Sequence, residues 1–200
     1  GNPETFEMAG KAGYNLLTHL LGQSISEVGE KIKVYRKAWK EAGHEGEGNL
    51  TLMLHTFVGP DERSVKETVR EPMKNYLRSA VNLVKEAAWS FPTFKQATTN
   101  AAGNFSMEHL SQEDLEAVLD YSFERYYQTS GLFGTPESCQ QIVEDLKQIG
   151  VDEIACLIDF GIDSDLVLAH LHYLNQLRIN SNKNAGQKAI SSDNFSIDSL

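Results

Sequence analysis

The first residues of the chain, GNPET, combine polar side chains with the start of a helix that we expect to end near Ala12. The first backbone N–H groups of a helix have no partner within it, and this end of the helix carries a partial positive charge. The side chains of Asn2 and Thr5 add polar groups at the same place. The segment is therefore either a capped helix start or a place where an anion can bind.

Histidines near the ends of two expected strands are the second candidates for chemistry. His55 lies near the end of a strand expected at residues 50–59, and His19 directly follows an earlier strand, with Thr18 and Gln23 close by. In a parallel α/β barrel the active site lies at the carboxyl ends of the strands. His55 is therefore a candidate catalytic residue, acting as a hydrogen-bond donor or a general base. The alternative for both histidines is a packed, hydrogen-bonded side chain.

Other reactive residue types do not form a recognisable site. Cys139 and Cys156 have no His–Asp pair at a catalytic spacing, so we expect both to fill the core. His170 and His172 are two residues apart on an expected helix, where side chains at that spacing face different directions. We therefore predict no metal site.

Charge and composition argue against several kinds of partner. The chain of 200 residues carries a net charge of -10 at pH 7, whereas binding to nucleic-acid phosphates relies on clustered Lys and Arg. No apolar run approaches the ~20 residues needed to span a bilayer. The two cysteines lack the spacing of a disulfide framework. We expect a cytoplasmic protein with no nucleic-acid partner and no membrane insertion.

The elements that hold these residues alternate between strands and helices. We expect strands at residues 14–18, 50–59 and 153–158, and helices at residues 4–12, 24–42, 61–89, 111–128, 136–150 and 164–177. This alternation is typical of a parallel α/β fold. Three strands are too few to close a barrel, and the chain begins in the middle of a strand–helix unit. We therefore predict the C-terminal part of a larger (β/α)₈ barrel.

Two segments fall outside this alternation. Residues 90–109 form a long loop with little apolar periodicity, and loops of this length are often functional, so this loop is a candidate lid. Residues 179–200 are polar and poor in aromatic residues, which favours a linker or disordered tail after a domain at residues 1–178. Because the first residue is Gly1 rather than Met, we expect a processed, trimmed or incomplete chain.

Four stretches together carry a family resemblance: GNPETFEMAGKAGYNLLTHLLGQS, LTLMLHTFVG with the later VREPMKNYLRS, SGLFGTPESC, and IGVDEIACLIDFG. They resemble the bacterial luciferase-like flavin-dependent monooxygenases, in particular the subgroup embedded in nonribosomal peptide and polyketide synthetases. The resemblance spans most of the chain up to about Leu177. The fold that it implies is α/β, a (β/α)₈ TIM barrel, of which this chain supplies the C-terminal portion, about three strands with their helices.

The resemblance also implies a cofactor and its site. Members of the family use reduced FMN supplied by a separate reductase, and some branches use a deazaflavin instead. In the family, the turn that matches GNPETF helps to hold the flavin phosphate, which implies cofactor-binding roles for Gly1, Asn2 and Thr5. The family often has a small hydroxyl residue where Asn2 stands, so a backbone contact is favoured there over a side-chain contact.

The implied reaction is the insertion of one oxygen atom from dioxygen into an organic substrate. In the synthetase-associated subgroup the expected substrate is an intermediate tethered to a carrier protein. The implied partners are the N-terminal half of the barrel, a flavin reductase and a carrier-protein domain. The alternative is a non-catalytic flavin-binding or interaction module derived from the same barrel.

Overall fold

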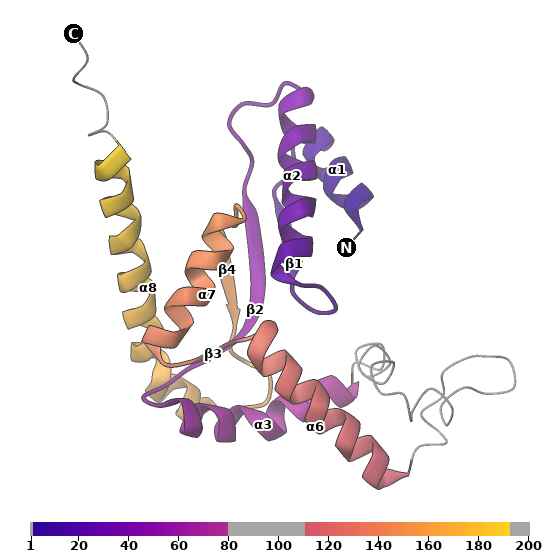
Figure 1. Ribbon diagram of the computed structural model, residues 1–200, viewed down its shortest axis with the longest axis vertical. Coiled ribbons are helices and arrows are strands. Elements are labelled where there is room, and N and C mark those ends of the chain that lie inside the picture. Colours follow the sequence, from indigo (N-terminus) through magenta and orange to yellow (C-terminus); the bar gives the residue numbers. More distant parts are fainter. Residues whose placement is uncertain (1, 80–110, 193–200) are drawn as a thin grey trace, which may run out of the picture.

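The computed structural model describes residues 2–79 and 111–192 of the chain. Its strands are β1 (Leu16–His19), β2 (Leu50–Val58), β3 (Leu132–Gly134) and β4 (Glu153–Leu157). Its helices are α1 (Pro3–Ala12), α2 (Ile25–Glu41), α3 (Glu62–Ser79), α6 (Gln112–Thr129), α7 (Pro136–Gln148) and α8 (Ser164–Ser192) (Figure 1). None of the helices in these ranges combines enough length with enough apolar character to cross a bilayer.

The described strands are parallel and are organised around β2. Strand β1 pairs with residues 50–53 of β2, and β4 pairs with residues 51–55 along the opposite edge. The short strand β3 pairs with residues 56–58, at the carboxyl end of β2. Parallel strands joined by helices confirm the predicted α/β class.

The expected strands differ from the observed ones in number and, by one or two residues, at several ends. We expected about three strands, and the structure has a fourth, β3, whose three residues are too few to show a sequence period. We expected the first strand to begin at Tyr14, but it begins at Leu16. The reason is that Gly13 takes a left-handed conformation and Tyr14 N–H donates to Ala9 O, so both residues still belong to the end of α1.

The sequence signals for helix starts are confirmed. The Ser24 side chain accepts a hydrogen bond from Glu27 N–H, and the Glu27 carboxylate accepts one from Ser24 N–H. These two bonds make a capping box at the start of α2. Thr135 caps α7, and Pro136 occupies the first helical position.

Helix α8 is longer than expected, and other expected features lie outside the described residues. We expected it to end near Leu177, but it continues to Ser192. The division into a domain at 1–178 and a tail at 179–200 stays a prediction. The expected extension of α3 to residue 89 and the candidate lid at 90–109 fall in the range 80–110, which is not described.

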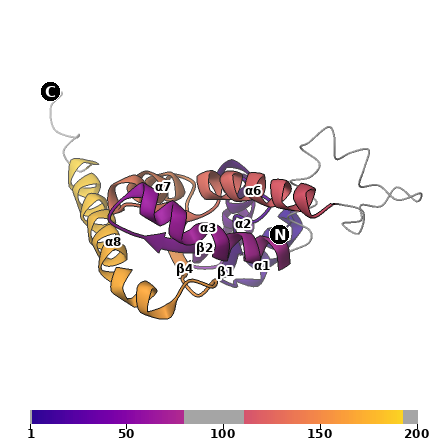
Figure 2. The same ribbon diagram turned by 90° about the horizontal axis from the view of Figure 1, so that it is seen from below.

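The two faces of the sheet have different surroundings. On one face Leu50, Leu52 and Leu54 are completely buried against residues of α2 and α7. On the other face Met53 is only half-buried, and Leu17 of β1 is 63% exposed. Within the described ranges, cover on this second face comes at the carboxyl end of β2, where α3 and α6 lie side by side (Figures 1 and 2). We call this second face the open face of the sheet.

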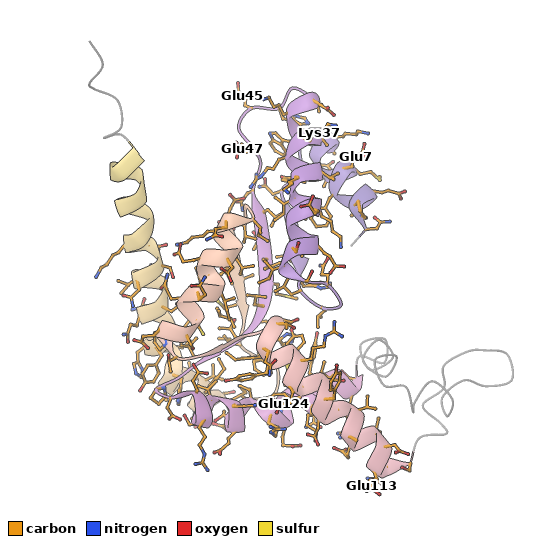
Figure 3. The ribbon with its side chains drawn as sticks, in the orientation of Figure 1. Glu7, Lys37, Glu45, Glu47, Glu113 and Glu124 are labelled. Atoms are coloured by element: carbon orange, nitrogen blue, oxygen red, sulfur yellow. The ribbon has the colours of Figure 1, made fainter. Side chains whose placement is uncertain are left out.

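A ladder of ion pairs joins α3 to α6. Its cations and carboxylates are each four residues apart along their helix, and each carboxylate contacts two cations. The members are Lys66, Arg70, Lys74 and Arg78 on α3, and Glu116, Asp120 and Glu124 on α6. Glu124 lies where the two helices meet (Figure 3).

Lys74 is the buried member of this ladder. Its side chain is 7% exposed, and its Nζ lies 2.9 Å from carboxylate oxygens of both Glu116 and Asp120. Burial opposes the charged form, but the hydrogen bonds and charges of the two carboxylates prevail and raise the pKa of Lys74 above its usual value. The ammonium group therefore stays charged and holds α3 against α6.

Removing this buried ammonium group is expected to destabilise the chain. Lys74→Ala should lower the free energy of unfolding by about 1–3 kcal/mol, because both carboxylates lose a partner in a partly desolvated site. Arg63→Ala on the same helix is the matched control, since the Arg63–Glu67 pair is exposed and should contribute under about 0.5 kcal/mol. Urea unfolding of both variants measures the difference. Equal losses in the two variants would show that the ladder does not join the helices energetically.

Candidate functional site

The start of α1 has the geometry of a capped helix with donors left over. Asn2 Oδ1 accepts from Thr5 N–H at 3.0 Å and from Thr5 Oγ1 at 2.8 Å, and both residues are exposed. Pro3 has no N–H, so the remaining donors at this start are the Asn2 side-chain amide and the backbone N–H groups of Asn2 and Glu4. Gly1 lies outside the described residues.

These donors suit a phosphate group, although one nearby carboxylate would repel it. N–H groups and the helix dipole attract an anion, whereas the carboxylate of Glu4 in the first turn repels it. Because the Thr5 hydroxyl already donates to Asn2, the backbone and the Asn2 amide are the groups left for a ligand. The cofactor-binding roles of Gly1, Asn2 and Thr5 stay predictions.

His55 lies in an aromatic cluster at the carboxyl end of β2. The side chain is 2% exposed, and its Nδ1 lies 2.7 Å from the hydroxyl oxygen of Tyr126 on α6. The ring of Tyr76 on α3 lies 4.3 Å away, between centroids, and Phe160, which follows β4, lies 5.3 Å away. Elements far apart in the sequence thus enclose one imidazole.

Burial makes this imidazole a weak base. It lowers the pKa of His55 to about 4, an effect partly opposed by the carboxylate of Asp159. Burial also raises the pKa of Tyr126, so the hydroxyl keeps its proton. A general base works best with a pKa near the working pH, so this environment favours a neutral His55 that donates or accepts hydrogen bonds. Its catalytic role stays a prediction.

Of the three residues expected at the mouth near β1, the structure brings His19 and Gln23 together and places Thr18 apart from them. The His19 Nδ1 accepts from Leu21 N–H at 3.1 Å, and Gln23 donates to the His19 carbonyl oxygen. Thr18 is buried on the opposite face of the strand, with Leu52 as its partner in β2. Burial and the nearby charge of Lys31 lower the pKa of His19.

A cavity of about 280 Å³ lies beside Tyr126, between the turn after β1 and helix α6. Its lining includes Gln23, Ser24, Glu27, Leu77, Ser122, Arg125, Tyr126, Thr129 and Ser130. The cavity therefore combines a guanidinium group, a carboxylate and several hydroxyl groups. Sequence reasoning missed Tyr76, Arg125, Tyr126 and Phe160, because their only signal was an aromatic or charged residue in a helical or loop segment.

The cysteines and the remaining histidines take structural positions. Burial raises the pKa of the Cys139 thiol to about 12 and also raises that of Cys156, so neither is a ready nucleophile. His170 and His172 contact carbonyl oxygens of α8 through their Nδ1 atoms. Over residues 2–79 and 111–192, no three His, Cys, Asp or Glu side chains are grouped as metal ligands.

A comparison with protein families shows to which family the chain belongs. The family model for luciferase-like monooxygenases matches residues 1–153, a range that includes the start of α1, His55 and Tyr126. The chain belongs to the luciferase-like monooxygenase family. A comparison with curated proteins gave no match.

Solved structures show the same fold. Monooxygenase RslO1 from Streptomyces bottropensis superimposes with a TM-score of 0.54 at 15% identity, over 86% of this chain and 43% of RslO1. The coenzyme F420-dependent tetrahydromethanopterin reductase from Methanopyrus kandleri gives 0.51 at 14% identity, over 76% of this chain and 42% of the reductase. The luciferase-like chain thus spans less than half the length of either structure, and its fold is part of the luciferase-like barrel, as predicted.

The buried His55 should make the stability of this luciferase-like chain depend on pH. Because its pKa falls from 6.5 to about 4 on folding, the unfolded chain takes up a proton between these values that the native chain does not. Stability from this group is therefore complete above about pH 6.5 and decreases as the pH falls towards about 4.

The His55→Gln variant tests this dependence, since glutamine has no such titration. The free energy of unfolding should decrease between about pH 7 and about pH 4.5 in both proteins. The decrease should be smaller in the variant than in the original chain, by about 2–3 kcal/mol. His172→Gln, which changes an exposed histidine, should behave like the original chain. Parallel pH profiles for all three proteins would mean that His55 is protonated in the native state as readily as in the unfolded chain.

Proposed function

We propose that this chain forms the FMN-binding C-terminal part of a monooxygenase that uses reduced FMN and dioxygen. The observation that carries the proposal is the family match over residues 1–153, which contains a capped helix start with donors suited to phosphate. When bound, the reduced flavin supplies the reaction with dioxygen. A deazaflavin is the second cofactor that we consider.

The chain's own residues bind and orient the ligands. The Asn2 amide and the N–H groups at the start of α1 hold the phosphate. The aromatic cluster around His55 excludes water from the carboxyl end of β2, where its rings leave the imidazole 2% exposed. The cavity beside Tyr126 receives part of the organic substrate.

The open face of the sheet supports a need for more of the barrel. Leu17 is 63% exposed there, and Met53 and Ala155 are half-buried, although interior faces of parallel strands are normally covered. We propose that the N-terminal half of the barrel covers this face, either in the same polypeptide or on a separate chain. A separate reductase supplies the reduced flavin.

The biological setting that we propose is cytoplasmic natural-product biosynthesis. The four stretches that resemble the synthetase-embedded subgroup support an intermediate tethered to a carrier-protein domain as the substrate. A non-catalytic flavin-binding module is the outcome if the chain binds flavin but supports no turnover with a reductase and the N-terminal half.

Flavin titration of the full chain, with and without the N-terminal half of the barrel, tests the function. The Asn2→Asp variant keeps an equally good helix cap but places a negative charge beside the proposed phosphate. FMN affinity, followed by flavin fluorescence, should fall about tenfold, equivalent to about 1.4 kcal/mol. Riboflavin, which has no phosphate, should bind the original chain and the variant equally.

The matched control is Ser111→Asp, which makes the same charge change at the capped start of α6. It should leave FMN affinity unchanged. Equal effects of the two variants would mean that overall charge, not the start of α1, governs binding. If FMN does not bind to the chain with or without the N-terminal half of the barrel, but a deazaflavin does, the deazaflavin becomes the proposed cofactor.

A further inference from the structure

The Nε2 atom of His55 is a buried polar atom without a hydrogen-bond partner among the described residues. Native proteins rarely leave such a group unpaired, because an unsatisfied buried donor or acceptor costs about 1–3 kcal/mol. The other ring nitrogen, Nδ1, is paired with the Tyr126 hydroxyl at 2.7 Å. An atom left in this condition at the carboxyl end of a barrel strand needs an explanation.

Hydrogen-bond counting favours one position for the ring proton. A neutral imidazole has one N–H group and one acceptor nitrogen. If Tyr126 donates to Nδ1, the proton lies on Nε2, and one buried group is left unpaired. If Nδ1–H donated to Tyr126 instead, both the tyrosine proton and the Nε2 lone pair would lack a partner within the described residues. The first arrangement leaves fewer unpaired groups, so His55 presents an N–H donor at Nε2.

The surroundings of this donor select the kind of acceptor. Aromatic rings of Tyr76, Tyr126 and Phe160 enclose the imidazole, and Asp159 and His19 are the charged or titratable groups that act on it from the loop after β4 and from β1. An anionic acceptor would be buried among these rings without a cation hydrogen-bonded to it, which is energetically costly. An uncharged carbonyl oxygen meets no such penalty and suits a single N–H donor.

We propose that His55 Nε2–H donates a hydrogen bond to an uncharged carbonyl oxygen of the bound flavin ring or of the organic substrate, and that Tyr126 positions this donor by fixing the tautomer. The proposal rests on the proposed function, because it needs a ligand at the carboxyl end of β2. The half-buried ring of Tyr76 packs edge-on against His55 and is the contact that a carbonyl group would have to share or replace. His55 is thus a donor to the ligand and not a general base.

Nitrogen NMR of the histidine rings in the ligand-free full chain tests the tautomer. The His55 signals are assigned by their loss in the His55→Gln variant. We expect Nδ1 to resonate as an acceptor nitrogen and Nε2 as a protonated nitrogen. The Tyr126→Phe variant should populate both tautomers, a change that a merely structural role of the hydroxyl would not produce. A proton on Nδ1 in the original chain would overturn the proposal.

Two probes then test the acceptor and distinguish its source. The full chain, together with the N-terminal half of the barrel, is titrated separately with FMN and with a short acyl thioester of N-acetylcysteamine. The Nε2 proton signal should shift with FMN if the acceptor is a flavin carbonyl, and with the thioester if it is a substrate carbonyl. No shift with either probe would overturn the proposal.

Affinity for the probe that shifts the signal provides the second readout. Glutamine at position 55 can offer an amide donor near the place of Nε2, so His55→Gln should keep affinity within about threefold, whereas His55→Leu should lose about tenfold or more. His172→Leu, on the exposed side of α8, is the control. Equal affinity of the Leu and Gln variants would overturn the donor role.

These outcomes remain separate from failure of the flavin function. If FMN does not bind at all but the thioester shifts the Nε2 signal, the flavin assignment is wrong and the donor role stands. If FMN binds with the predicted response to Asn2→Asp while neither probe moves the Nε2 signal, the flavin function stands and the donor role is wrong.

Discussion

A strand of a parallel sheet needs apolar cover on both of its faces, and the structure is organised by how β2 meets this requirement. One face meets it completely, because Leu50, Leu52 and Leu54 are buried against α2 and α7. The open face meets it at the carboxyl end, where α3 and α6 cover His55 and Phe57. The candidate site therefore lies at the border between covered and open sheet, at a residue that the fold itself has desolvated.

The pair of helices that makes this cover carries both an ion-pair ladder and aromatic side chains, and Arg70 of the ladder lies over the ring of Phe123. Along one line the helices are joined by the ion-pair ladder, in which Lys74 is the buried cation. Tyr76 of α3 and Tyr126 of α6 pack edge-on against the ring of His55. Every cation of the ladder has a carboxylate partner on α6, so the two helices pack together without leaving any of these cations unpaired. The neutral state of His55 follows mainly from its burial beneath these helices.

Local signals were sufficient for the helix starts and insufficient for strand β3 and for the site. Ser24 with Glu27, and Thr135 with Pro136, predict helix starts because capping involves residues three or fewer positions apart. Strand β3 could not be predicted, since three residues become a strand only by pairing with residues 56–58 of β2.

The partners of His55 were beyond sequence reasoning for a related reason. Tyr126 is 71 residues away along the chain, and only the packing of α6 across the sheet brings its hydroxyl to Nδ1. The strand pattern placed His55 near a carboxyl end but could not show its burial, which decides its protonation. The family resemblance added the barrel and the helix start, since these follow from motifs, whereas the neutral state of the imidazole depends on tertiary contacts.

The two candidate ligand contacts are physically different, and under the proposed function this difference would orient a flavin. The start of α1 is exposed and offers N–H groups to an anion, whereas the His55 cluster is desolvated and offers one neutral donor.

The chain carries a net charge of -10, so it repels a phosphate at long range, and salt screens that repulsion beyond about 8–10 Å. Attraction of the proposed phosphate would therefore have to come from donors in direct contact, such as those at the start of α1. Charge does not exclude an uncharged ring system from the start of α1 or from the His55 cluster. Its binding is more favourable at the His55 cluster, because water is absent there. A molecule with a charged end and an uncharged ring is then bound in one direction, because reversing it would bury the phosphate among aromatic rings and leave the ring in water.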